Sequence, residues 1–169
     1  MKKFFKIFLC AAMIFSFSSE NVSAAVTELS DDNMLAFMTK CNRELKKNDP
    51  NNSLDTPALR ETFKTYAETL PISDSAKVNL IYTTKNDKIY SIKLEANSAD
   101  ENVKNFFEGM NLVYLQALGL SVEEAKELTE TDNMTEWRKE KFISTLGKKI
   151  IVDFKNTKRP ILTIIATDK

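Results

Sequence analysis

The sequence contains no histidine. Without an imidazole, the chain cannot form a Ser-His-Asp triad or a Cys-His pair, and it cannot shuttle protons through histidine near neutral pH. Every zinc site that uses a histidine ligand is excluded as well. The absence therefore removes the commonest hydrolase and metalloenzyme mechanisms before any motif is considered.

Cysteine is nearly absent. The chain has two, Cys10 and Cys41, and the first lies in an N-terminal apolar run. A lipoprotein acylated at Cys10 is rejected, because the preceding Leu9 is too bulky for that cleavage and the cut would fall inside the run. Once the leader is removed, only Cys41 remains, so no intramolecular disulfide can form. The fold must depend on its hydrophobic core.

The first 24 residues have the pattern of a secretory signal peptide. A basic start, Met1 to Lys6, precedes an apolar run through Phe17, and the segment Val22-Ser23-Ala24 supplies small residues for signal peptidase. The run is too short, and wrongly flanked, for a membrane-spanning helix. The sequence therefore predicts an exported protein, periplasmic or extracellular, with residues 1–24 cleaved.

The mature chain has no block of one charge. The leader holds Lys2, Lys3, Lys6 and Glu20, so the remaining 145 residues keep 21 of 24 basic and 23 of 24 acidic residues, a net charge of −2. Nucleic-acid binding needs clustered Lys and Arg, so no nucleic-acid partner is expected. No second apolar run approaches spanning length. A chain of this size can bury about 70% of its unfolded surface, which predicts one domain over 25–169.

Two segments with period-two alternation predict β-hairpins. They are the stretch 78–97, VNLIYTTKNDKIYSIKLEAN, and the stretch 150–169, IIVDFKNTKRPILTIIATDK. Successive strand side chains point to opposite faces, so each strand has one apolar face. Placing both apolar faces of a hairpin on one side requires a loop with an odd number of residues.

The simplest odd loops fix the expected pairing. In the first hairpin the loop Lys85-Asn86-Asp87 would place Tyr82 opposite Tyr90, Leu80 opposite Ile92 and Val78 opposite Leu94. In the second hairpin the loop Thr157-Lys158-Arg159 would place Phe154 opposite Leu162, Val152 opposite Ile164 and Ile150 opposite Ala166.

Outside these hairpins, helical spacing predicts amphipathic helices. The first begins near Ser30 and ends near Lys47. A second runs from Thr56 and Pro57 to Leu70, and a third opens with the capping box Ser98–Glu101 and ends at Gly119. A short helix follows the capping box Ser121–Glu124 and continues to Glu130. The last helix, Met134 to Leu146, fits the period less well, and part of it could be strand.

The two halves of the mature chain resemble each other. The run Asp31-Asp32-Asn33-Met34 matches Asp100-Glu101-Asn102-Val103, Tyr66 to Leu70 resembles Phe142 to Leu146, and the hairpins correspond at an offset of 72. This pattern suggests half-repeats 28–97 and 98–169, although similar amphipathic layouts can also converge. Either origin predicts an α+β domain, with one antiparallel sheet built from two β-hairpins and helices packed on one face.

Two polar features carry weak chemical signals. Cys41 shares a helical stripe with Phe37, Met38 and Leu45, which indicates a buried thiol rather than a reactive one. The loop Asp49–Asp55 has oxygen side chains at every second position, as in the start of an EF-hand. It has Leu54 where glycine is needed and Arg60 where a bidentate glutamate belongs, so an Asx-rich turn is the simpler interpretation. We expect no metal and no cofactor.

A carboxylate pair is one catalytic arrangement that the composition leaves open. Glu123, Glu124, Glu127 and Glu130 are clustered, and glycoside hydrolysis needs only two carboxylates at a defined separation. Carboxylates at helical spacing on a short helix are usually a solvated face, and nothing nearby predicts an apolar pocket that would raise one pKa. A non-enzymatic protein is the expectation.

The second face of the predicted sheet is unusually apolar. It carries five isoleucines, with Ile151 directly opposite Ile165 and Ile161 beside Lys155. A solvated face normally alternates more cleanly with polar residues. Either a segment of this chain covers the face or it is a contact surface. The candidate binding residues are Ile81, Ile89, Ile151, Ile161 and Ile165.

These observations favour a small exported binding or protein-interaction module over a catalyst. The expected partner is another envelope or secreted protein. The alternatives are a small exported hydrolase that uses paired carboxylates and a structural envelope protein held by self-association.

We predict that the exported protein begins at Ala25, because a signal peptidase recognises the small residues that end at Ala24. Intact-mass measurement of the protein recovered after export checks this start. A mass that includes Met1, or a lipid on Cys10, would contradict it.

Overall fold

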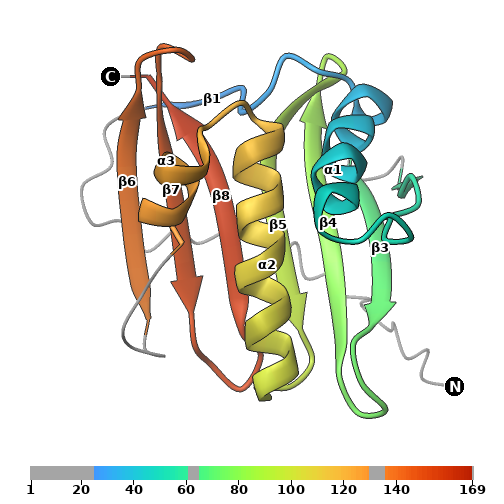
Figure 1. Cartoon of the computed structure of the whole chain (residues 1–169). Coiled ribbons are helices and arrows are strands. Elements are labelled where there is room, and N and C mark those ends of the chain that lie inside the picture. Colours follow the sequence, from blue (N-terminus) through green and yellow to red (C-terminus); the bar gives the residue numbers. More distant parts are fainter. Residues whose placement is uncertain (1–24, 61–64, 130–135, 169) are drawn as a thin grey trace, which may run out of the picture.

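A computed structural model describes residues 25–60, 65–129 and 136–168 of the chain. Figure 1 shows a broad sheet with helices on one of its faces. In chain order the elements are β1 (Val26–Thr27), α1 (Met34–Asn48), β2 (Ala58–Arg60), β3 (Thr65–Pro71), β4 (Lys77–Lys85), β5 (Lys88–Ala96), α2 (Glu101–Ala117), α3 (Val122–Glu127), β6 (Trp137–Ile143), β7 (Lys148–Lys155) and β8 (Ile161–Thr167).

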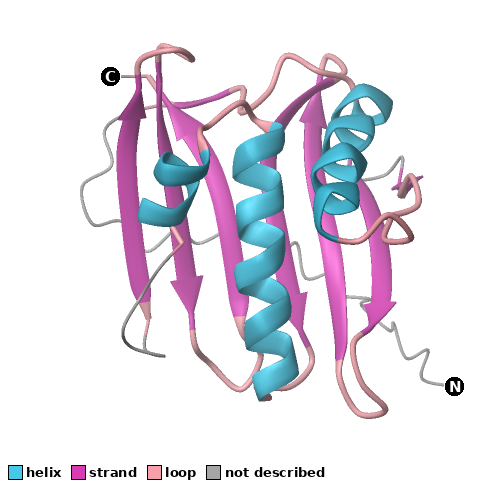
Figure 2. Cartoon of the chain, viewed as in Figure 1, coloured by secondary structure: helices cyan, strands magenta, loops and turns pink. Residues whose placement is uncertain are grey.

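The sheet is antiparallel and its strand order is nearly symmetric. The order is β2-β3-β4-β5-β8-β7-β6, and β1 pairs with the end of β8. Two meanders, β3-β4-β5 and β6-β7-β8, therefore meet through the β5–β8 pair. Within the described ranges α1, α2 and α3 lie on the same face, as Figure 2 shows. The predicted α+β class is correct, but the sheet has eight strands rather than the four of two hairpins.

The β7–β8 hairpin of the second meander follows the predicted register. Phe154 lies opposite Leu162, Val152 opposite Ile164 and Ile150 opposite Ala166. All six side chains face the helices and are buried. Pairing ends at Lys155 and Ile161, so the connection is residues 156–160 rather than three residues alone.

The first hairpin has a different register from the predicted one. Lys85 pairs with Lys88 across a two-residue turn, Asn86-Asp87, in which both residues have positive φ (51° and 60°). Such a type I′ turn matches the twist of the strands. A β-bulge at Tyr90 then shifts the pairing, so that Tyr82 lies opposite Ile92 and Leu80 opposite Leu94.

The bulge places the apolar faces of β4 and β5 on the same side of the sheet, which a loop with an odd number of residues was expected to do. A two-residue turn alone would have placed the apolar face of β5 on the side opposite that of β4. One extra residue in β5 restores the match, because side-chain direction alternates with every residue. The expected loop Lys85-Asn86-Asp87 and the expected Tyr82–Tyr90 pair are therefore wrong.

Two predicted helices are strands. The segment Thr56–Leu70 forms β2 and β3, with residues 61–64 outside the described residues, and the described part of Met134–Leu146 forms β6 and a turn that ends at Gly147. In β3, Tyr66, Glu68 and Leu70 alternate toward the helices. Tyr66 and Leu70 are four residues apart, so these two would also share one face of a helix, which is why helical spacing fitted the segment. The adjacent strands β4 and β7 supply backbone hydrogen-bond partners along their whole lengths, and this tertiary pairing overrides the helical pattern.

The remaining helices are present with shifted starts. The side chain of Asn33 caps α1 and that of Asp100 caps α2, so Ser30 and the Ser98–Glu101 box do not begin these helices. The Ser121–Glu124 capping box is present at α3, although that helix ends at Glu127. Gly119, with φ of 99°, follows the end of α2 as expected.

The centre of the core is an aromatic cluster that joins both long helices to the sheet. Phe37 of α1 packs against Tyr82 of β4 and Tyr114 of α2, with ring centroids 6.5 and 6.2 Å apart. The two tyrosine hydroxyls form a buried hydrogen bond of 2.7 Å. All three side chains are 0% exposed. We call Phe37, Tyr82 and Tyr114 the aromatic cluster.

Burial raises the pKa of both tyrosine hydroxyls well above the ordinary value for tyrosine. The folded protein therefore holds these protons more tightly than the unfolded chain does. This tighter proton binding makes its full contribution to the stability of the folded state below about pH 10, the ordinary pKa of tyrosine. The contribution is lost as the pH rises above that value, because the unfolded chain then releases these protons and the folded protein does not.

We predict that Tyr82→Phe and Tyr114→Phe are strongly non-additive. Either single change leaves a buried hydroxyl without its partner and should lower the free energy of unfolding by about 1–3 kcal/mol. The double change removes both hydroxyls and should cost less than the sum of the two. Urea unfolding of the three variants measures the coupling. Additive losses would show that the hydroxyls do not act as a pair.

Candidate functional site

The face of the sheet away from the helices is the candidate contact surface. Strand pairing places residues on it in rows that run across the sheet. One row is Ser91, Ile165 and Ile151, the next is Lys93, Thr163 and Asp153, and the third is Glu95, Ile161 and Lys155. We call this surface the open face, since the described helices lie on the other side (Figure 1).

Three predicted site residues occupy the open face and keep some exposure. Ile161 and Ile165 lie two residues apart on β8, and Ile81 lies on β4; all three are half-buried. Strand β5 separates Ile81 from the other two and carries the ion pair Lys93–Glu95, whose charged atoms are 3.1 Å apart. The apolar patch is therefore centred on β8, with Thr163 between its two isoleucines.

Ile89 does not belong to the open face, and this part of the prediction is wrong. The β-bulge at Tyr90 turns the Ile89 side chain toward the helices, where it is 0% exposed and part of the core. Its backbone pairs with Ser30, which precedes α1. A one-residue bulge reverses the direction of every side chain beyond it, which explains the error.

Ile151 lies on the predicted face but offers almost no surface. It is directly opposite Ile165, as expected, yet it is only 2% exposed. It can therefore support Ile165 from the side without contacting a partner itself. The exposed candidate residues reduce to Ile81, Ile161 and Ile165.

The polar residues of the open face carry more positive than negative charge. Glu140 forms ion pairs with Lys149 and Arg138, at 3.4 and 3.9 Å. The strand registers place seven basic and three acidic residues on this face. The basic residues are Lys77, Lys85, Lys88, Lys93, Arg138, Lys149 and Lys155, and the acidic residues are Glu95, Glu140 and Asp153; Lys88 also pairs with Asp31. An acidic partner surface would complement the excess.

The acidic cluster on α3 does not form a catalytic pair among the described residues. Glu124 is committed to the capping box, and the backbone N–H of Ser121 lowers its pKa, opposite to the shift that a general acid needs. Glu123 is exposed, and Glu127 is exposed and forms an ion pair with Lys141. Glu130 lies outside the described residues.

The Asp49–Asp55 loop uses its oxygen atoms to shape a turn. Asp49 Oδ1 accepts a hydrogen bond from the backbone N–H of Asn51. The side chain of Asn42 on α1 clamps Leu54, accepting from its N–H and donating to its carbonyl oxygen. Among the described residues no group of three or more histidine, cysteine, aspartate or glutamate side chains is placed to hold a metal ion.

Glu68 is a carboxylate that the sequence analysis did not single out. It lies on the helix-facing side of β3, and its Oε2 atom is buried without a hydrogen-bond partner. Burial, and secondarily the charge of Asp55, raise its pKa. Its inward position follows from the alternation Tyr66, Glu68, Leu70, a signal that the helical interpretation of this segment concealed.

Comparison of the chain with protein-family models, with curated proteins and with solved structures finds no match. In the part of the chain that the structure describes, no helix is long and apolar enough to cross a membrane.

Cys41 is 0% exposed on the inner side of α1. Burial raises the pKa of its thiol well above the ordinary range, so the thiolate that a nucleophile requires is not formed near neutral pH.

We predict that a bulky thiol reagent labels Cys41 in the native protein no faster than the protein unfolds. Cys41→Ser should fold and lose about 1–2 kcal/mol of unfolding free energy, because it places a hydroxyl in an apolar site. Rapid native labelling would contradict this assignment.

Proposed function

We propose that the protein is a small exported binding module that engages another envelope or secreted protein through the open face. The observation that carries the proposal is the pair Ile161 and Ile165, which keep exposure on the side of the sheet opposite the described helices. An apolar patch within a charged surface is characteristic of a protein contact site.

The dimensions of the open face support a protein partner. Six adjacent strands, β3-β4-β5-β8-β7-β6, are spaced about 4.8 Å apart and are each about 23–30 Å long, which gives an area on the order of 700 Å². This is close to the roughly 800 Å² per partner of a standard interface. Removing the half-buried isoleucines from water at about 25 cal/mol per Å² would supply only part of the binding free energy. The excess of basic side chains favours a partner with an acidic surface.

The export step remains a prediction from the sequence, because residues 1–24 lie outside the described residues. If the leader is cleaved after Ala24, the mature chain starts immediately before β1. The N-terminal segment is then held by β1 on β8 and by Lys148, which donates a hydrogen bond of 2.8 Å to the Glu28 carbonyl oxygen.

We also infer that the domain is a duplicated unit. The pairing of β5 with β8 is symmetric about the Lys93–Thr163 pair. If each residue of β5 corresponds to the residue 70 positions later in β8, Ile92 corresponds to Leu162 and Leu94 to Ile164. Ile92 pairs with Ile164 and Leu94 with Leu162, so each residue pairs with the counterpart of the other. Tyr66 opposite Tyr82 corresponds to Trp137 opposite Phe154. This correspondence replaces the one expected between Tyr66–Leu70 and Phe142–Leu146.

We predict opposite outcomes for lysine at two neighbouring positions of β8. Ile165→Lys changes the open face and should shift the melting temperature by only a few degrees. Ile164→Lys buries an ammonium group in the core, where Ile164 is 0% exposed, and should unfold the domain. Circular dichroism melts compare the two. Unfolding of Ile165→Lys would show that the open face is internal.

The contact itself is tested with a photo-crosslinking residue at Thr163, at the centre of the patch, in cells that export the protein. Crosslinking at Leu35, which is 65% exposed on the helix side, is the control. An adduct specific to position 163, weakened by Ile165→Lys and by added salt, supports the proposal. An adduct with the mass of two chains indicates self-association instead. No adduct, or equal adducts at both positions, overturns the open face as the site.

A further inference from the structure

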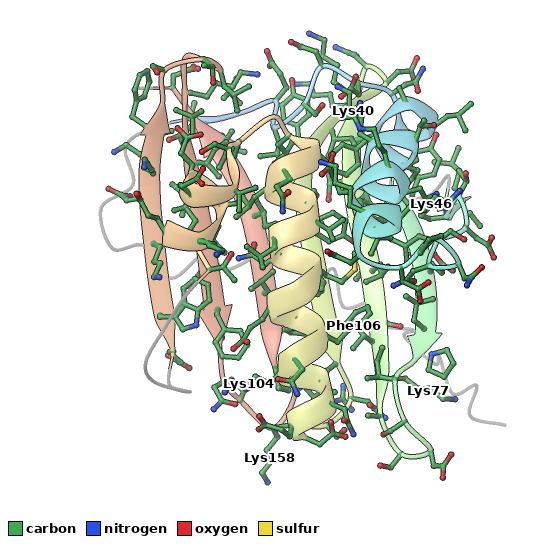
Figure 3. All side chains as sticks on the ribbon, viewed as in Figure 1. Lys40, Lys46, Lys77, Lys104, Phe106 and Lys158 are labelled. Atoms are coloured by element: carbon green, nitrogen blue, oxygen red, sulfur yellow. The ribbon has the colours of Figure 1, made fainter. Side chains whose placement is uncertain are left out.

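A cavity of about 150 Å³ lies where α2 begins beside the connection between β7 and β8. Val103, Phe107, Phe154 and Pro160 form its apolar floor, and Asp100 and Lys104 lie at its mouth. Figure 3 shows Lys104 near this end of α2 and Lys158 on the adjoining connection. The cavity lies on the helix side of the sheet and is separate from the open face.

The floor of the cavity is suited to an aromatic ring. Phe107 and Phe154 pack edge to face, with centroids 6.3 Å apart and planes at 88°. A third ring can extend such an arrangement through offset or edge-to-face contacts. An apolar cavity of about 150 Å³ accepts a molecule the size of benzene. The volume of the cavity and its aromatic lining therefore both favour a ligand with one six-membered ring.

The described part of the first half of the domain has no such cavity at the equivalent place, because side chains fill the space where α1 begins. The topology alone therefore does not create the cavity. In that half α1 begins beside the β4–β5 turn, and Leu29, Met34 and Ile89 occupy the space with exposures of 3%, 4% and 0%. Three backbone hydrogen bonds of 2.7–3.1 Å join residues 29–30 to Ile89. Where α2 begins, the chain offers only Ala99 before the helix and Pro160 at the end of the β7–β8 connection, and these residues leave the space open.

The mouth of the cavity carries more negative than positive charge. The Lys104 ammonium lies 4.0 Å from the carboxylates of Glu101 and Glu108. The Asp100 carboxylate caps α2 by accepting a hydrogen bond of 2.9 Å from the Val103 N–H. An anionic ligand would therefore meet repulsion at the mouth, whereas a neutral hydroxyl can donate to a carboxylate or accept from Lys104.

We propose that this cavity binds a small neutral aromatic molecule of the phenol class. Its ring packs on Phe107 and Phe154, and its polar substituent lies at the mouth beside Asp100 and Lys104. This assignment does not depend on the proposed protein contact at the open face.

Phenol is the probe, and protein-observed NMR of the exported protein is the measurement. Saturable shifts of resonances from the first turns of α2 and from Phe154 are expected, with a Kd on the order of 1 mM for so few atoms. Val103→Met extends a side chain into the cavity, as Met34 does in the space where α1 begins, and should raise the Kd at least tenfold. Val122→Met, at the exposed start of α3, is the matched control and should leave the Kd unchanged.

If Val103→Met does not fold, Ala99→Leu narrows the mouth from an exposed position and replaces it in the comparison. Benzoate should bind at least tenfold more weakly than phenol, because the carboxylates at the mouth repel an anion. Shifts that do not saturate, a Kd that both filling variants leave unchanged, or binding of benzoate equal to that of phenol would overturn the proposal.

Discussion

The aromatic cluster of Phe37, Tyr82 and Tyr114 is the interaction on which the arrangement of the described helices depends. Phe37 of α1 and Tyr114 of α2 pack on each other and on Tyr82 of β4, so the cluster joins the two long helices to each other and to the sheet. The hydrogen bond between the tyrosine hydroxyls satisfies two polar atoms that have no access to water. Such a bond adds little net stability, but its loss leaves a buried donor or acceptor unpaired, and this constrains where the helices can lie.

With the helices fixed on one side, the other side of the sheet is available for a partner. Strand β5 and its Lys93–Glu95 ion pair separate Ile81 from the isoleucines of β7 and β8, so the open face does not form one continuous apolar strip. Interspersed charges of this kind protect a sheet from nonspecific association while leaving a small apolar centre. The α2 cavity has a different chemistry, because it has an apolar floor and an excess of carboxylates at its mouth. The two sites are therefore expected to recognise different classes of ligand.

Much of the fold follows from local patterns. The alternation in β4, β5, β7 and β8 identified four strands, and the β7–β8 register followed from parity together with the choice of the simplest odd loop. The buried stripe of α1, including Cys41, and the capping box of α3 were also evident from the sequence. Of the five candidate isoleucines, four lie on the predicted face. These features depend on the period of side-chain direction, which each segment carries in its own residues.

The remaining features were decided by contacts between distant parts of the chain. Whether Tyr66 and Leu70 belong to a helix or a strand depended on β4, which offers hydrogen-bond partners along its edge. The direction of Ile89 depended on one extra residue at Tyr90, and the burial of Ile151 on its surroundings in the folded sheet. The sequence by itself determined which residues share a face within α1 and within the regular parts of β4, β5, β7 and β8, because side-chain periodicity is local. Only the tertiary structure decided which strand lies beside which and how much of each face remains exposed, because strand pairing and burial join residues far apart in the chain.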